Sequence, residues 1–251
     1  MIKAILNGCN GKMGRVVSEE VSKTSDIQIV AGIDKNTQPS PYGYPVFENI
    51  DMFEGNADLI IDFSRPESIP ALVSYAERTK TALMVATTGL GKEHTELLEQ
   101  AAKTVPVFHT ANMSLGVNLV KDICCRVAAV LSEGFDIEIT EFHHNQKADA
   151  PSGTALMLAK AIKETLGQNR EFVYGRSPQS GKRQQNEIGV HAIRGGTMPG
   201  EHSVLFAGPD EIIEIKHTAL SRRIFALGAL RAARFITEQK PGLYNMDSIL
   251  S

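Results

Sequence analysis

Ile2-Lys-Ala-Ile-Leu-Asn-Gly-Cys-Asn-Gly-Lys-Met-Gly14 is an apolar run that leads into three glycines spaced three residues apart. The residues after it, 15–23, have the apolar spacing of a helix. Glycines at a strand-to-helix turn allow tight curvature, a close approach of the backbone to a pyrophosphate, and close packing of the helix on the sheet. The usual dinucleotide fingerprint has its first glycine at position 9 instead of Gly8, so this turn alone is weak evidence for a nucleotide site.

The next strand-like run strengthens the case for a nucleotide. It covers residues 27–33 and ends at Asp34, twenty residues after Gly14, where a dinucleotide-binding domain has the acid that binds the adenosine ribose. Lys35 could pair with a 2′-phosphate, helped by Lys12, or could be an exposed surface lysine. We therefore expect a nicotinamide dinucleotide, with NADH bound and NADPH tolerated.

Strand-like and helix-like runs alternate through the first part of the chain. Further strands are expected over residues 58–63, 81–86 and 105–108. The alternation predicts a mostly parallel, Rossmann-like sheet covered on both faces, with ligands at the carboxyl ends of the strands. Thr87, Thr88 and Asn112 follow such ends, where a nicotinamide and its ribose would lie, although ordinary turns use the same residue types.

From residue 136 the pattern changes to several strands with one clear helix among them. The strand-like runs cover residues 136–143, 187–193, 202–207 and 211–217. They predict an α+β second domain with an open mixed sheet. An apolar helix over 221–239 is expected to return to the first domain. The α/β chain would then have a dinucleotide-binding domain at 1–112 and 222–251 and a second domain at 113–221.

Residues 141–154, Glu-Phe-His-His-Asn-Gln-Lys-Ala-Asp-Ala-Pro-Ser-Gly-Thr, bring a proton donor, a cation and a helix start together in the sequence. Histidine titrates near neutral pH, so His143 can give or take a proton, and Lys147 offers a compact positive charge to an anion. Ser152-Gly-Thr154 opens an amphipathic helix whose first N–H groups could hold a small anion. A strand end followed by an ordinary helix cap would use the same residues, and residue types alone do not decide between the two.

Three other features keep more than one interpretation. The polar segment 174–186 is expected to be a mobile, solvated loop, with a lid over the site as the less favoured alternative. Arg194-Gly-Gly196 is either a hairpin bend or an anion contact. His191, His202 and His217 lie on predicted strands and are expected to support the fold, not to take part in catalysis.

The composition excludes several classes of protein. The chain has 251 residues, is 42% hydrophobic and carries a net charge of −3, so it has no general attraction to nucleic acid or an anionic membrane. Cys9, Cys124 and Cys125 form neither a disulfide framework nor a zinc-binding spacing, and no metal is expected. The chain opens directly into a strand and has no apolar run of membrane-spanning length. We expect a cytoplasmic protein with no membrane or nucleic-acid partner.

With these pieces in place, the chain resembles the 4-hydroxy-tetrahydrodipicolinate reductase (dihydrodipicolinate reductase) family of diaminopimelate and lysine biosynthesis. The run His-His-x-x-Lys-x-Asp-Ala-Pro-Ser-Gly-Thr is the signature of that family and is highly specific. The resemblance extends from Gly8 almost to the C-terminus and is carried by Gly8-Cys-Asn-Gly-Lys-Met-Gly14, Asp62-Phe-Ser-Arg-Pro-Glu67, Thr87-Thr-Gly89, Asn112-Met-Ser-Leu-Gly-Val-Asn118, residues 141–154, Glu187-Ile-Gly-Val-His-Ala-Ile-Arg-Gly-Gly196 and Pro241-Gly-Leu-Tyr244.

The resemblance implies an NADH- or NADPH-dependent reduction of a small cyclic imine dicarboxylate. The 4-hydroxyl of the ring leaves as water, the nicotinamide delivers hydride to carbon 4, and the enamine that results takes a proton at carbon 3. By the same resemblance, His143 is the proton donor and Lys147 assists protonation and charge balance. His144 would contact the substrate, and Gly153 and Thr154 would hold one of its carboxylates.

The resemblance also implies cofactor contacts and an assembly. The protein would be a homotetramer joined through the sheets of its second domain. Two positions depart from better-known members, namely an aspartate at 34 where many have glutamate and an alanine at 86 where glycine is common, and both bear on cofactor preference. The implied cofactor contacts are Gly8, Cys9, Asn10, Gly11, Lys12, Met13, Asp34, Lys35, Ala86, Thr87, Thr88, Thr110, Ala111, Asn112 and Met113.

Two rival functions fit parts of the sequence. A semialdehyde or homoserine dehydrogenase would share the dinucleotide domain, but the first needs a strand-end or loop cysteine nucleophile near a histidine, which this sequence lacks. A nucleotide-sensing protein without activity would not need His143, Lys147 and the Ser-Gly-Thr helix start together. Consumption of NADH with the fresh condensation product of pyruvate and aspartate semialdehyde would separate these functions.

Overall fold

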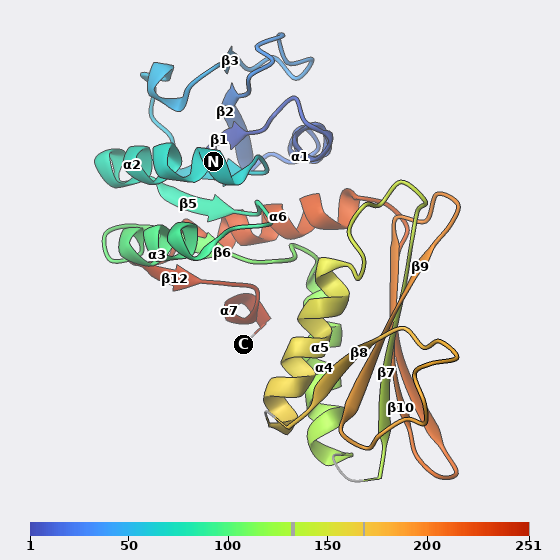
Figure 1. Ribbon diagram of the computed structural model, residues 1–251. Helices are drawn as coiled ribbons and strands as arrows, with labels where there is room; N and C mark the ends of the chain where they lie inside the picture. Colours follow the sequence, from blue (N-terminus) through green and yellow to red (C-terminus); the bar gives the residue numbers. More distant parts are fainter. Residues whose placement is uncertain (132–133, 168, 251) are drawn as a thin grey trace. The chain divides into compact units, whose positions relative to one another are not determined.

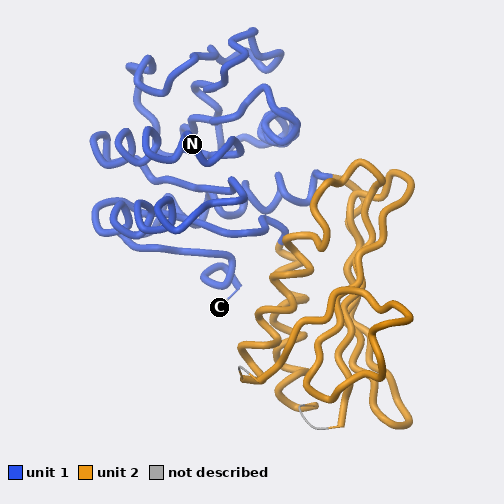
Figure 2. The backbone as a smooth tube through the Cα atoms, in the orientation of Figure 1, with its two compact units in different colours: residues 1–114, 222–251 blue, residues 115–221 orange. Residues whose placement is uncertain are grey.

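The computed structural model describes residues 1–131, 134–167 and 169–250. It divides into two units, one made of residues 1–114 and 222–251 and the other of residues 115–221 (Figure 2). Each unit has its own sheet and its own buried core (Figure 1).

Unit 1 contains a seven-stranded parallel sheet in the order β12-β6-β5-β4-β1-β2-β3. Successive strands run outward from β1 in one direction and from β4 in the other, so the strand order reverses between β1 and β4, as in a Rossmann fold. The predicted Rossmann-like sheet is therefore confirmed. The strands are β1 Ile2–Asn7, β2 Ile27–Ile33, β3 Val46–Phe47, β4 Leu59–Asp62, β5 Ala82–Val85, β6 Pro106–His109 and β12 Gly242–Tyr244.

Helices lie on both faces of this sheet. Helices α1 and α6 contact each other, as do α2 and α3, and the apolar residues of the central strands are buried against them. The helix after Ser64 begins as the 3-10 turn η2 and continues as α2, where Pro70 near the start removes no helical hydrogen bond. The helical segments are α1 Lys12–Val21, η1 Ile50–Met52, η2 Pro66–Ser68, α2 Ile69–Thr79, α3 Lys92–Ala101, α6 Arg223–Ile236 and α7 Asp247–Leu250.

Unit 2 contains a five-stranded sheet in the order β11-β10-β7-β9-β8. Strands β7, β9 and β8 are parallel, whereas β10 is antiparallel to β7 and β11, so the predicted mixed sheet is confirmed. Helices α4 (Leu115–Val130) and α5 (Gly153–Leu166) lie side by side along one face (Figure 1). The strands are β7 Asp136–His143, β8 Glu171–Tyr174, β9 Glu187–Arg194, β10 Gly200–Ala207 and β11 Ile212–Ala219.

Strand β7 separates the two faces of this sheet by strict alternation. Its odd-numbered residues, including Ile137 and Ile139, are buried in the core with α4 and α5, while its even-numbered residues are partly exposed. Because side chains on a strand alternate between faces, Glu141 and His143 lie on the helix-covered face and Glu138 on the open one. The register of β7 therefore decides which side chains meet beneath the helices.

Arginines of the loop between β8 and β9 pair with carboxylates of the sheet, Arg176 with Glu187 and Arg183 with two residues of β7. Most of residues 174–186 are exposed, as expected for a solvated loop. The Arg183 side chain, however, is only 17% exposed and binds Asp136 at 2.6 Å and Glu138 at 2.9 Å. The loop is therefore solvated over most of its length, while two carboxylates on β7 hold Arg183.

Candidate active site

The glycine turn of unit 1 lies where the strand order reverses. Gly8 follows β1 with a φ of +77°, and a Cβ there would lie 2.5 Å from the Phe63 carbonyl oxygen after β4. A Cβ on Gly14 would lie 2.2 Å from the Gly8 carbonyl oxygen. Both positions therefore require glycine, one for the contact between the turns and one for the packing of α1 on its own turn.

Asp34 reaches the glycine turn from the end of β2. Its carboxylate accepts hydrogen bonds from the backbone N–H of Asn10 at 2.9 Å and of Asn36 at 3.0 Å. Asp34, which is predicted to bind the ribose, therefore lies next to the glycine turn, which is predicted to bind the pyrophosphate. Lys12 and Lys35 are exposed and form no ion pair with the residues that the structure describes. The Cys9 side chain points into the core, where burial raises the pKa of its thiol to about 11.

A buried carboxylate connects three strand ends on the same side of the sheet. Asp62, at the end of β4, accepts hydrogen bonds from Asn7 Nδ2 at 2.8 Å, Ser64 Oγ at 2.5 Å and Thr87 Oγ1 at 2.7 Å. Burial raises the pKa of Asp62, and these hydrogen bonds oppose that rise. The sequence motif included Asp62 without assigning it a role, although a carboxylate that ends an apolar strand is a detectable signal.

The remaining cofactor residues expected in unit 1 lie in the turns after β5 and β6. Thr87 is buried and its hydroxyl is used by Asp62, whereas Thr88 is exposed. In the second turn, Thr110 donates a hydrogen bond to the Asn112 carbonyl oxygen at 3.0 Å, and Asn112 Oδ1 accepts one from the N–H of Ser114 at 2.8 Å. These polar side chains therefore serve at least partly to build the turns.

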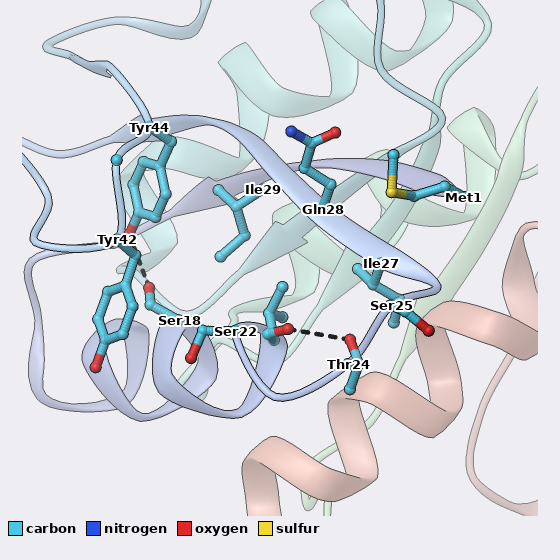
Figure 3. A pocket seen from close by; sticks show the side chains of 12 residues that line it. Met1, Ser18, Ser22, Thr24, Ser25, Ile27, Gln28, Ile29, Tyr42 and Tyr44 are labelled. Atoms are coloured by element: carbon cyan, nitrogen blue, oxygen red, sulfur yellow. Dashed lines mark hydrogen bonds between the residues drawn. The ribbon is translucent and has the colours of Figure 1, made fainter.

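A pocket in unit 1 lies apart from these strand ends. It has a volume of about 360 Å³ and lies between the second half of α1, the first half of β2 and the segment 42–44 (Figure 3). Tyr44 and Ser18 are hydrogen-bonded at 2.7 Å in its wall. None of its lining residues belongs to the glycine turn or to the turns after β5 and β6. This pocket is therefore not the predicted dinucleotide site.

In unit 2, a buried glutamate organises the residues around His143. The Glu141 side chain has no exposed surface and accepts a hydrogen bond from His143 Nδ1 at 2.5 Å, two from Arg194 at 2.7 Å each, and one from the N–H of Ser152 at 2.9 Å. Burial by itself would raise the pKa of Glu141, but these hydrogen bonds outweigh it and lower the pKa to about 2. Arg194 is not at a hairpin bend, because β9 and β10 do not pair, and its guanidinium is bound to Glu141.

A second buried histidine packs against His143. The rings of His143 and His202 meet edge to face with centroids 5.1 Å apart, and His202 Nε2 lies 2.9 Å from Ser152 Oγ. Burial, followed by the charge of His143, lowers the pKa of His202 to about 4, so His202 is neutral near pH 7. Gly200 makes room for the His143 ring, because a Cβ there would lie 2.9 Å from its Nε2.

The turn after β7 and the start of α5 complete this set. Lys147 pairs with Asp149 at 2.8 Å and remains 21% exposed at its side chain. Ser152 caps α5 by accepting the N–H of Ala155, and Gly153 is exposed with open space where a Cβ would be. The structure therefore brings His143, the start of α5 and Glu141 together, with Glu141 as the residue that the sequence interpretation missed.

Comparisons with known proteins assign this architecture to a family. The family model for the N-terminus of dihydrodipicolinate reductase matches residues 2–113, and the model for its C-terminus matches residues 116–250. The chain belongs to the dihydrodipicolinate reductase family. A relative from Caldanaerobacter subterraneus subsp. tengcongensis named 4-hydroxy-tetrahydrodipicolinate reductase is 51% identical over 100% of this chain and 98% of its own. One from Clostridium novyi with the same name is 50% identical over the same shares.

Solved structures agree with this family assignment at the level of the fold. A dipicolinate-bound dihydrodipicolinate reductase from Paenisporosarcina sp. TG-14 matches with a TM-score of 0.81 and 24% identity, over 98% of this chain and 97% of that one. A diaminopimelate dehydrogenase from C. glutamicum matches with a TM-score of 0.60 and 15% identity, over 98% and 92%. This chain therefore also has a fold similar to that of the C. glutamicum enzyme.

The described residues contain neither a candidate membrane helix nor a cluster of metal-binding side chains. Within the described ranges, no helix of this family member is long and apolar enough to cross a membrane. The same described residues contain no group of three or more histidine, cysteine, aspartate or glutamate side chains arranged to hold a metal ion.

The folding stability of this reductase should depend on the ionisation of Glu141. The folded pKa of about 2 lies below the ordinary 4.5, so the ionised group stabilises the fold above pH 4.5 and loses this effect as the pH falls towards 2. We expect the difference in unfolding free energy between the parent and Glu141→Gln to shrink by about 2 kcal/mol between about pH 6 and pH 3. Urea denaturation at several pH values measures both unfolding free energies. If their difference does not change with pH, the fold does not depend on the ionisation of Glu141.

Proposed function

We propose that this chain reduces 4-hydroxy-tetrahydrodipicolinate to tetrahydrodipicolinate, with loss of water, in diaminopimelate and lysine biosynthesis. The observation that carries the proposal is the set of His143, Lys147 and the α5 start, present in a chain about half identical over its full length to reductases of that name. A substrate with two carboxylates and a ring that gains a hydride needs a cation, an anion-binding backbone and an acid. Unit 2 contains all three.

In this proposal His143 is the acid. Its Nδ1 is held by Glu141, and its Nε2 has no hydrogen-bond partner among the described residues, which leaves that atom to exchange a proton with a ligand. Hydride arriving at carbon 4 makes the ring electron-rich, and the proton from Nε2 goes to carbon 3. Lys147 lies three residues beyond His144 on an exposed turn and contributes the positive charge that balances the substrate carboxylates.

The start of α5 is proposed to bind one substrate carboxylate, while Lys147 or His144 faces the other. Ser152 is occupied on both sides, since its N–H binds Glu141 and its hydroxyl binds the N–H of Ala155. The N–H of Gly153 has no such partner among the described residues, and the absent side chain leaves an anion room to approach. The N-terminus of a helix favours negative charge, which supports roles for Gly153 and Thr154.

Unit 1 is proposed to bind the nicotinamide dinucleotide, which supplies the hydride when bound. The residues present fit such a group, because Gly8 and Gly14 keep the turn free of side chains and the first turn of α1 contains Lys12 and no acidic residue. Asp34, the residue proposed to bind the ribose, is hydrogen-bonded to this turn. We propose that NADH binds and that Lys35 allows NADPH to bind as well.

The proposed reaction is tested by mixing the purified protein with NADH and the fresh condensation product of pyruvate and aspartate semialdehyde. We expect the NADH absorbance to fall, and His143→Ala to lower turnover by about a hundredfold or more with cofactor affinity nearly unchanged. His94→Ala, on α3 of unit 1, is the control for loss of an imidazole. Turnover of His143→Ala within a few-fold of the parent would remove His143 from the mechanism, and NADH binding without consumption would favour a sensor.

The cofactor proposal is tested with Lys35→Ala. An exposed charge pair contributes about 1 kcal/mol, so we expect Kd for NADPH to rise about fivefold while Kd for NADH stays nearly constant. Fluorescence titration measures both constants. Lys92→Ala, which removes a lysine whose side chain is 89% exposed on α3, should change neither. Equal losses for the two cofactors in Lys35→Ala would show that Lys35 is only a surface charge.

We also propose that four copies associate through the open face of the unit 2 sheet. The proposal follows from the family resemblance, and on this face Ile193 is 52% exposed and Ile212 is 66% exposed. Sedimentation equilibrium should give the mass of four chains for the parent and a smaller mass for Ile193→Glu. Ile123→Glu, at a 38% exposed position on α4, should remain a tetramer. A monomeric parent would contradict the proposal.

A further inference from the structure

We propose that Glu141 is a positioning residue for the reaction, which holds His143 in one orientation and one tautomer and fixes it relative to the start of α5. This inference rests on the proposed function, because it takes His143 as the proton donor. It adds a residue that touches neither substrate nor cofactor and acts through the imidazole.

The sequence places the two side chains next to each other. Glu141 and His143 are two residues apart on β7, so they project from the same face of the strand, and His143 Nδ1 lies 2.5 Å from Glu141 Oε2. An ionised carboxylate can only accept hydrogen bonds, so Nδ1 must carry the hydrogen. The proton that His143 exchanges with a ligand is then confined to Nε2, as in other sites where a carboxylate orients an imidazole.

The glutamate is itself held rigidly from two other elements. Arg194 on β9 donates to both carboxylate oxygens at 2.7 Å, and the N–H of Ser152 donates to Oε1 at 2.9 Å. Arg194 is fixed in turn by the carbonyl oxygens of Ile193 and Asp149, at 2.7 Å each. With four donors around a fully buried carboxylate, Glu141 cannot rotate without leaving a buried charge unpaired, which costs several kcal/mol.

Glu141 also links His143, the proposed proton donor, to the helix start that is proposed to bind a substrate carboxylate. Ser152 is the cap of α5, and Gly153 is the next residue. Glu141 therefore has one hydrogen bond to the imidazole and another to the backbone that begins the helix. A ring bound by its carboxylate at this helix start would meet His143 Nε2 at a distance set by Glu141.

The charges around His143 indicate what loss of the carboxylate does. Glu141 and Arg194 form a buried pair of opposite charge, His202 on β10 is neutral near pH 7, and Lys147 and Asp149 pair in the turn after β7. Glu141→Gln would leave Arg194 uncompensated beside the imidazole, which disfavours a protonated ring. The variant should therefore lose both the orientation and the readiness of His143 to carry a proton.

The test combines ring NMR with kinetics on the full-length protein. In the parent, the neutral His143 ring, assigned by its loss in His143→Asn, should carry its hydrogen on Nδ1. In Glu141→Gln the two tautomers should mix, and kcat should fall about 10- to 100-fold with little change in KM for NADH. Glu141→Asp, which restores the charge on a shorter side chain, should recover part of the loss.

Glu138→Gln is the matched control on the same strand. Glu138 binds a histidine, His191, at 2.6 Å and an arginine, Arg183, at 2.9 Å, but on the open face of the sheet. This substitution should leave the tautomer of His143 and kcat unchanged. A general effect of removing a glutamate from β7 would instead alter both.

The outcomes separate this inference from the proposed function. If His143→Ala is inactive while Glu141→Gln keeps its kcat within about threefold and the same His143 tautomer, the positioning role is wrong and the proposed function stands. If His143→Ala stays active, the proposed function fails. If Glu141→Gln does not fold, as judged by circular dichroism, the parent ring decides, because a neutral His143 with its hydrogen on Nε2 would contradict the role of Glu141.

Discussion

A carboxylate that has no contact with water must have its charge satisfied inside the protein, and in unit 2 this requirement falls on Glu141. Its four hydrogen bonds come from His143 on β7, from Arg194 on β9 and from Ser152 at the start of α5. Since each donor is fixed to a different position of the sheet or helix, the three elements hold one another in place. The geometry around the imidazole is therefore a consequence of burying one charge.

Unit 1 uses the same physical device at the ends of its strands. Asp62 is fully buried and collects hydrogen bonds from Asn7, Ser64 and Thr87, which belong to the ends of β1, β4 and β5. In both units a carboxylate at or near the end of a strand organises the turns where a ligand is proposed to bind. Functional side chains at such sites need partners that fix their rotamers, and buried hydrogen-bonded carboxylates provide them.

Much of the fold could be predicted from the sequence because its signals are local. The glycine turn and the alternation of strands and helices indicate the Rossmann-like sheet, and the strict alternation in β7 gives the predicted bounds 136–143. Helix α3 was not predicted, because it contains few apolar residues and only Leu98 and Ala101 of its ten residues are buried. The short strands β3 and β12 have two and three residues, too few for a pattern.

The candidate site was predicted less completely, because its decisive contacts join residues far apart in the sequence. His143 and Lys147 could be found from a local motif, whereas the bonds from Arg194 to Glu141 cross 53 positions. The central claim is that a fixed imidazole protonates the ring. A crystal structure with NADH and dipicolinate tests it most directly. The account predicts His143 Nε2 facing ring carbon 3 at about 3.0–3.5 Å with Nδ1 still on Glu141, and an Nε2 directed away from the ring would contradict it.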